Sequence, residues 1–264
     1  MYEHIQVSEG DGITTITLCR PERLNTFIGH MRRDLAEALE HAGSDRNTRV
    51  VILTGAGRAF CAGGDIAFMA ELMQRRDSEE FSRILGAGRR VILAIRQMTK
   101  PVIAAVNGPA SGAGCNLALA CDLRVASNTA TFSQSFAKLG LHPDWGGTYF
   151  LPRLVTPNKA CELFFLGEAI DAEEALRLEI VNQVVAPEDL ESDTATCRTP
   201  TRRAADRLSC RKARGLHEPG GRARRDAALR NRSAVTLLRF RRRSRRHSRV
   251  SRKTRTEIHR PLIC

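Results

Sequence analysis

The chain has 264 residues, of which 42% are apolar, so it can bury a sizeable core as one large domain or two small ones. No run approaches the roughly 20 apolar residues of a membrane helix, and residues 1–10 hold no apolar signal segment, so we expect a cytoplasmic protein with no membrane contact. The eight cysteines form no CxxC pair, so we expect reduced thiols. The net charge of +13 would suit a nucleic-acid partner, but it is confined to one end: residues 1–191 carry 19 Lys and Arg against 24 Asp and Glu, and residues 192–264 carry 23 against 5.

Short apolar strands alternate with amphipathic helices along residues 1–191, which is typical of an α/β protein. In chain order we expect a hairpin over residues 5–18, a helix that Thr26 caps and Gly43 ends, a buried strand at 50–53, a helix over 81–95, buried strands at 102–106 and 122–126, and helices that begin at Thr156 and Asp171.

Three glycine-rich turns follow these strands, at residues 55–65, 107–116 and 140–147. Glycine allows positive φ angles and lets a ligand approach the backbone N–H groups closely. The second turn leads into a helix start over 115–121, where free N–H groups and the helix dipole favour negative charge. The turns therefore indicate an anion site, or else only tight connections; none of them reads GxGxxG, as a dinucleotide site would.

The amino-acid sequences of these segments and their order along the chain resemble those of the crotonase (enoyl-CoA hydratase/isomerase) superfamily. Residues 58–65, RAFCAGGD, are similar to the AFxAGxD segment of that family, and residues 100–108, KPVIAAVNG, match its KPVIAAVNG letter for letter. Residues 111–122 resemble its GGGxxLAxxCD. The resemblance covers residues 3–190, and several ordered motifs together are far more specific than any one of them.

This resemblance implies a superhelix of ββα units that binds an acyl-CoA thioester as its substrate, with no further cofactor and no metal. It places an oxyanion hole at the backbone amides of Gly64 and Ala113, which would stabilise the thioester enolate. The family's CoA-binding positions correspond here to Arg23, Leu24, Ala62, Gly64, Asp65, Ile66 and Ala67. Ala67 stands where a lysine is often found, and Arg23 suits a solvated surface as well as a CoA contact.

The sequence departs from the family pattern at the two catalytic glutamates of the hydratases. Asn116 and Phe136 occupy those positions, and neither side chain can transfer a proton as a carboxylate does. Asn116 is a candidate to hydrogen-bond the substrate or a water, or to satisfy a buried backbone group. Standard hydratase activity is therefore disfavoured.

One carboxylate remains near the third glycine-rich turn. Residues 139–148 resemble the GLxPDxGG segment of isomerase-like members of the family, in which the aspartate moves a proton between carbons. Asp144 is our catalytic candidate, with its pKa raised by apolar neighbours such as Phe136 and Trp145. The alternative is that Asp144 only caps a helix after Pro143.

Residues 192–264 are expected to form a basic tail in place of the C-terminal helices of the family. Arginine outnumbers lysine there by 21 to 2, and no helical or strand periodicity remains. From this composition we expect the segment to be disordered, and our hypothesis is that it is translated from a shifted reading frame. With an intact C-terminal region, the resemblance implies a homotrimer or hexamer.

Double-bond isomerisation is the function that these features favour. The alternatives within the family are a hydratase that uses Asp144 alone and a thioester hydrolase or dehalogenase that uses it as the nucleophile. A different class of function is RNA binding through the basic tail on a crotonase fold.

Overall fold

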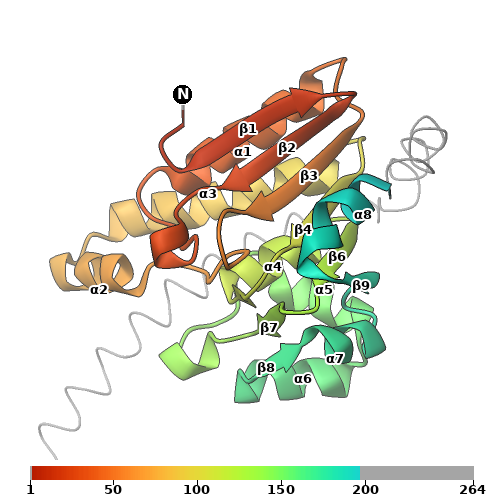
Figure 1. Cartoon of the computed structure of the whole chain (residues 1–264). Helices are drawn as coiled ribbons and strands as arrows, with labels where there is room; N and C mark the ends of the chain where they lie inside the picture. The colour runs from red at the N-terminus through yellow and green to blue at the C-terminus, as the bar shows by residue number, and fades with distance from the viewer. Residues whose placement is uncertain (1, 197–264) are drawn as a thin grey trace, which may run out of the picture. The chain divides into compact units, whose positions relative to one another are not determined.

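The structure is a computed structural model and describes residues 2–196. In this part of the chain a sheet of six strands forms the centre of the fold (Figure 1). The first two strands make an antiparallel hairpin, and all later neighbours pair in parallel. The order across the sheet is β1 (Ile5–Gly10), β2 (Ile13–Leu18), β3 (Val50–Gly55), β4 (Val102–Val106), β6 (Leu123–Ser127) and β9 (Gln183–Val185).

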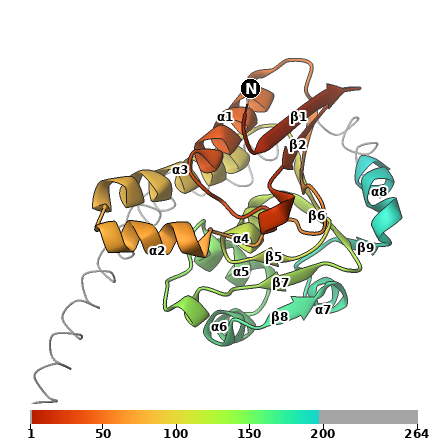
Figure 2. The same cartoon turned by 60° about the vertical axis from the view of Figure 1, so that its left-hand side comes forward.

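A smaller sheet lies beside the larger one, as Figure 2 shows. Its strands, in order, are β5 (Ala110–Ser111), β7 (Thr131–Ser133) and β8 (Ala169–Asp171). A strand of the large sheet, a strand of the small sheet and a helix follow one another as β4-β5-α4 and again as β6-β7-α5. The expected ββα repeat is therefore present.

Helices of the described residues pack around the sheets. They are α1 (Met31–Ser44), α2 (Ile66–Arg75), α3 (Ser78–Gln97), α4 (Ala113–Ala120), α5 (Gly147–Leu154), α6 (Pro157–Leu166), α7 (Ala172–Arg177) and α8 (Leu190–Thr196), with short 3-10 turns at Pro21–Arg23, Ala137–Leu139 and Pro187–Asp189.

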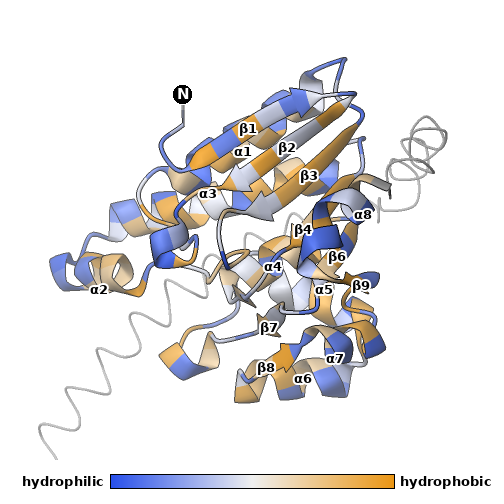
Figure 3. Cartoon of the chain, in the orientation of Figure 1, coloured by the Kyte–Doolittle hydropathy of each residue, from blue (hydrophilic) through white to orange (hydrophobic). Residues whose placement is uncertain are grey.

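Strand β3 is buried on both faces, which explains its continuous apolar sequence. Val51 and Leu53 belong to the main core with residues of α1, α3 and α4, whereas Val50 and Ile52 pack into a second cluster with Leu190 of α8. Figure 3 shows the hydrophobic colour along β3, while apolar and polar residues alternate in β1.

Most of the predicted elements are confirmed. The hairpin, the buried strands β3 and β4 and the long helix α3 lie where the apolar patterns placed them. Both predicted helix starts carry the expected caps: the Thr156 hydroxyl accepts from the amide of Lys159 at 3.3 Å, and the Asp171 carboxylate accepts from the amide of Glu174 at 2.8 Å.

The predicted ends of the first helix were wrong. Helix α1 begins at Met31, and the Thr26 hydroxyl instead accepts a hydrogen bond from the Arg20 guanidinium at 2.8 Å. Gly43 lies inside the helix, which continues to Ser44. The buried side chains of Met31, Leu35 and Leu39 hold the helix in place, so its ends follow from packing and not from caps.

The tail prediction lies mostly outside the described residues, which end at Thr196. Helix α8 runs through the boundary that we expected at residue 191, and its Leu190 side chain is buried. Among residues 2–196, none of the helices combines the length and the apolar character needed to cross a membrane.

The first two glycine-rich turns pack backbone against backbone. The amide of Cys61 donates to the carbonyl oxygen of Pro109 at 3.1 Å, and the amide of Ser111 donates to the carbonyl oxygen of Cys61 at 2.9 Å. A Cβ atom on Gly114 would overlap that same Cys61 carbonyl. Helix α4 can approach the first turn this closely only because Gly114 has no side chain.

We expect Gly114→Ala to lower the free energy of unfolding by about 3 kcal/mol or more, since the added Cβ must push α4 away from Cys61. Urea unfolding measures this change. Gly86→Ala in α3 is the control, because no atom lies within 4 Å of its added Cβ, and it should stabilise the fold by up to about 1 kcal/mol. A Gly114→Ala protein as stable as the wild type would contradict the packing argument.

Candidate active site

Gly64 and Ala113 lie on the two turns that face each other. The amide of Phe27 donates to the carbonyl oxygen of Gly63 at 2.8 Å and the amide of Asp65 donates to the carbonyl oxygen of Phe27 at 3.1 Å, which leaves the N–H of Gly64 between them. A Cβ on Gly63 would lie 3.5 Å from the amide nitrogen of Ala113, so the two turns are in contact. Within residues 2–196, neither the Gly64 amide nor the Ala113 amide donates a hydrogen bond.

The start of helix α4 adds a favourable field for negative charge. Ala113 is its first residue, and the first N–H groups of a helix have no partner within it. The preceding residue, Gly112, has φ +53° and ψ −118°, a conformation that favours glycine. This local backbone presents the Ala113 amide at the end of the helix.

Asp144 is the carboxylate of this region. The residue is half-buried, but its Oδ1 atom is shielded from solvent and has no hydrogen-bond partner in the described part of the chain. Burial raises the pKa of Asp144 to about 7, and the nearby positive charge of Arg32 opposes part of this rise. The carboxyl group can therefore exist in both protonation states near neutral pH.

Asn116 holds the Asp144 loop against helix α4. Its side chain is fully buried. Its Nδ2 donates to the backbone carbonyl of Asp144 at 2.8 Å, and its Oδ1 accepts from the side-chain Nε2 of Gln134 at 2.8 Å. Of the two roles considered from the sequence, the satisfaction of a buried backbone group matches these contacts.

The two aromatic side chains that were expected near Asp144 are buried. Phe136 and Trp145 are each 7% exposed. The Trp145 ring stacks on Phe27, with 4.6 Å between ring centroids, and Phe136 lies 3.7 Å from where a Cβ on Gly112 would stand. The position of the second hydratase glutamate is thus held by the apolar ring of Phe136.

The alternative role for Asp144 as a helix cap does not fit the structure. Helix α5 begins at Gly147 with Gly146 before it, and no side chain caps it. The neighbouring His142 is exposed, and its Nδ1 lies 2.8 Å from the carbonyl oxygen of Pro143.

The residues expected at the CoA side come from two adjacent segments. The amide of Ala62 donates to the carbonyl oxygen of Leu24 at 2.9 Å, which joins the end of the hairpin to the first glycine-rich turn. Asp65 is engaged otherwise: its carboxylate pairs with Arg20 at 2.8 Å and caps α2 through the amide of Phe68 at 3.1 Å. The remaining residues of this set are Arg23, Ile66 and Ala67, all of them exposed.

Sequence reasoning missed Arg32, which lies on α1 and is only 4% exposed. Its Cζ lies 5.3 Å from the centre of the Phe27 ring, and its Nη2 lies 3.4 Å from where a Cβ on Gly64 would stand. Burial lowers the pKa of Arg32 to about 10, and the charge of Asp144 acts against this shift. The only signal in the sequence was an arginine beside the apolar face of a helix, which usually indicates a side chain at the surface.

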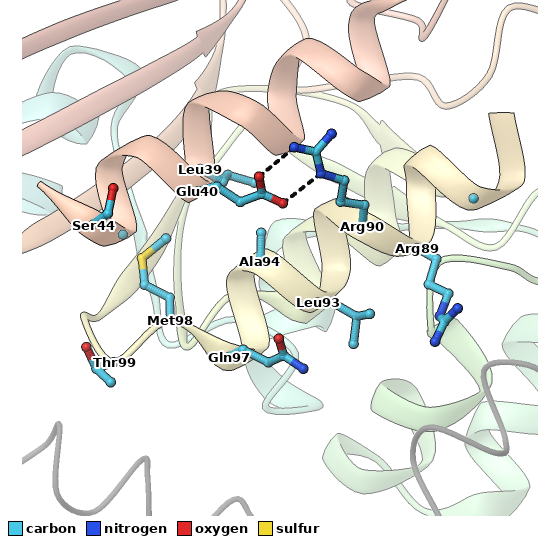
Figure 4. A pocket seen from close by; sticks show the side chains of 12 residues that line it. Leu39, Glu40, Ser44, Arg89, Arg90, Leu93, Ala94, Gln97, Met98 and Thr99 are labelled. Carbon is cyan, nitrogen blue, oxygen red and sulfur yellow. Dashed lines mark hydrogen bonds and ion pairs between the residues drawn. The ribbon is translucent and has the colours of Figure 1, made fainter. Parts of the chain in front are cut away.

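A cavity of about 610 Å³ lies between α1 and α3 (Figure 4), where Arg90 pairs with Glu40 at 2.6 Å. None of the site residues above lines it, so it is separate from the Gly64, Ala113 and Asp144 region. Residues 2–196 contain no group of three or more His, Cys, Asp or Glu side chains placed to hold a metal ion.

The chain matches a family model described as enoyl-CoA hydratase/isomerase over residues 8–210. It is 40% identical over 190 residues to a crotonyl-CoA hydratase of Syntrophomonas wolfei, covering 72% of each chain. It is 41% identical over 202 residues to a 1,2-epoxyphenylacetyl-CoA isomerase of Escherichia coli, covering 74% of each chain.

The structure is also similar to the crystal structure of an enoyl-CoA hydratase from Mycobacterium avium subsp. paratuberculosis, with a TM-score of 0.78 and 28% identity, covering 90% of this chain and 95% of that one. The fold, the ordered motifs and these matches agree, so the chain belongs to the enoyl-CoA hydratase/isomerase family.

Proposed function

We propose that this chain is an acyl-CoA isomerase that moves a carbon–carbon double bond, with Asp144 as the acid and base. The observation that carries this proposal is the carboxylate of Asp144, whose Oδ1 is shielded and has no partner within residues 2–196 and whose pKa is raised to about 7. A carboxyl group with a pKa near the working pH can accept a proton from carbon and return it.

The proposed reaction uses two sets of groups. The amides of Gly64 and Ala113 donate to the thioester oxygen and stabilise the enolate that forms when the Asp144 carboxylate removes a proton from the α-carbon of a 3-enoyl thioester. The electron pair of that C–H bond delocalises through the enolate. Asp144 then gives the proton to the γ-carbon, the double bond moves to the α,β position, and the carboxylate is regenerated.

The two missing glutamates favour isomerisation over hydration. Asn116 and Phe136 stand where the resemblance places the hydratase carboxylates, and Asn116 is already committed to Gln134 and to the Asp144 carbonyl. Hydration needs a base for water and an acid for the α-carbon, whereas isomerisation needs one group that serves two carbons. The relatives named as hydratase and as isomerase fit either reaction, so the support for isomerisation comes from these two side chains.

The proposal also covers CoA binding, the oligomeric state and the location of the protein. Arg23, Leu24, Ala62 and residues 64–67 would bind CoA, and the proton transfer as written needs only the protein and the thioester. A homotrimer or hexamer, and a cytoplasmic location, stay predictions from the sequence.

We expect Asp144→Asn to lower the rate of α-proton exchange on 3-enoyl-CoA about 10²- to 10⁴-fold, because an amide cannot accept the proton. Deuterium exchange at the α-carbon, followed by mass spectrometry or NMR on a panel of 2-enoyl-, 3-enoyl- and aryl-CoA thioesters, measures this rate. Asp11→Asn in the exposed hairpin turn is the matched control and should leave the rate unchanged.

Two outcomes would contradict the isomerase. Water addition to 2-enoyl-CoA that is faster than double-bond movement would favour a hydratase that uses Asp144 alone. Release of free CoA, or of halide from an aryl-CoA, in the wild type would favour the hydrolase or dehalogenase alternative.

The raised pKa of Asp144 also predicts how stability depends on pH. The folded protein retains a proton that the unfolded chain loses between about pH 4 and pH 7, so stability falls as the pH rises through this window. The cost at pH 8 is on the order of 4 kcal/mol as an upper bound. Relative to the wild type, Asp144→Asn should therefore be more stable at pH 8 than at pH 5, as urea unfolding at both values measures. Parallel pH profiles of the two proteins would show that Asp144 is not desolvated.

A further inference from the structure

Arg32 is a buried cation for which the proposed reaction has no use. Its Nε and Nη1 atoms are shielded from solvent and have no hydrogen-bond partner among residues 2–196. A buried charged donor without an acceptor is costly, and such groups persist mainly where a ligand supplies the missing partner. Arg32 therefore needs an explanation in terms of function.

The surroundings of Arg32 place this cation at the reacting end of the site. Its guanidinium lies beside Gly64 and over the Phe27 ring, and Phe27 in turn stacks on Trp145, next to Asp144. The CoA-side carboxylate of Asp65 does not satisfy it, because that group is paired with Arg20.

The charges of Arg32 and Asp144 influence each other without direct contact. Each shifts the pKa of the other, yet no ion pair within 4.0 Å joins them in the described residues. Two of the three guanidinium nitrogens, Nε and Nη1, thus have N–H donors that no residue of the described chain accepts from, and such donors suit an oxygen acceptor, neutral or anionic.

We propose that Arg32 binds an oxygen atom on the acyl group close to the thioester, so that this enzyme prefers acyl groups with an oxygen substituent near the thioester carbonyl over plain hydrocarbon chains. The inference rests on the proposed function, since it places an acyl-CoA between Gly64 and Asp144. A hydrocarbon chain there would leave the guanidinium donors unpaired, whereas an oxygen substituent would pair with them.

The test compares the binding of thioesters that differ in one group. Butyryl-CoA and methoxyacetyl-CoA have chains of equal length, with a methylene in the first where the second has an ether oxygen, and malonyl-CoA carries a carboxylate. Isothermal titration calorimetry gives the three dissociation constants. We expect the wild type to bind at least one oxygen-bearing thioester about tenfold more tightly than butyryl-CoA, and Arg32→Met to reduce that ratio to about one.

Ratios within one protein cancel a general loss of folded material, so a purely structural role of Arg32 would not change them. Arg33→Met is the matched control, because Arg33 is the neighbouring arginine on α1 and is half exposed, and it should keep the wild-type ratio. Arg32→Gln provides a second variant should the methionine fail to fold, and it should also lower the ratio.

The outcomes separate this inference from the proposed function. Butyryl-CoA that binds as tightly as both other thioesters, or a preference that survives in the Arg32 variants, overturns the role of Arg32 alone. Failure of all three thioesters to bind overturns the proposed function and this inference with it.

Discussion

The site depends on one steric constraint, the contact between the backbones of two glycine-rich turns. Helix α4 reaches Cys61 because Gly114 has no side chain. The same approach brings the first turn so close to α4 that a Cβ atom added to Gly63 would lie 3.5 Å from the amide nitrogen of Ala113. Two N–H groups from distant parts of the chain are thereby left without acceptors on neighbouring surfaces. The parallel strands β3 and β4 fix the positions from which both turns start, so these two strands hold the site rigidly in place.

Charge is the second feature that organises this region. The fold removes a carboxylate and a guanidinium from water without pairing them directly, which costs more stability than a buried ion pair or an apolar pair would cost. Asp144 thereby exists in both protonation states near neutral pH, and Nε and Nη1 of Arg32 have no hydrogen-bond partner in the described part of the chain. Proteins accept such destabilised groups where chemistry requires them, at the expense of the marginal stability of the fold.

Much of the fold could be predicted from the sequence, because strands such as β3 and β4 are apolar runs that lead into glycine-rich turns and helix starts such as Thr156 carry their own caps. The ends of α1 could not, since packing of Met31 and Leu35 sets them and Thr26 is used by Arg20. In the site, Gly64, Ala113 and Asp144 came from ordered motifs. Arg32 could not be found, because its burial depends on the way the chain before α1 turns to place Phe27 against it and on Gly64, which lies far from it in the chain.

The contacts of Asn116 limit how this site can change. Its amide joins three segments at once, since it sits on α4, donates to the Asp144 carbonyl and accepts from Gln134, and Gly147 packs so closely that a Cβ there would overlap it. A glutamate at this position has no N–H to give and needs room for one more methylene. It would release the loop that carries Asp144 before it could act on water. A change of Asn116 to glutamate would therefore disturb the position of the Asp144 loop at the same time as it added a second carboxylate.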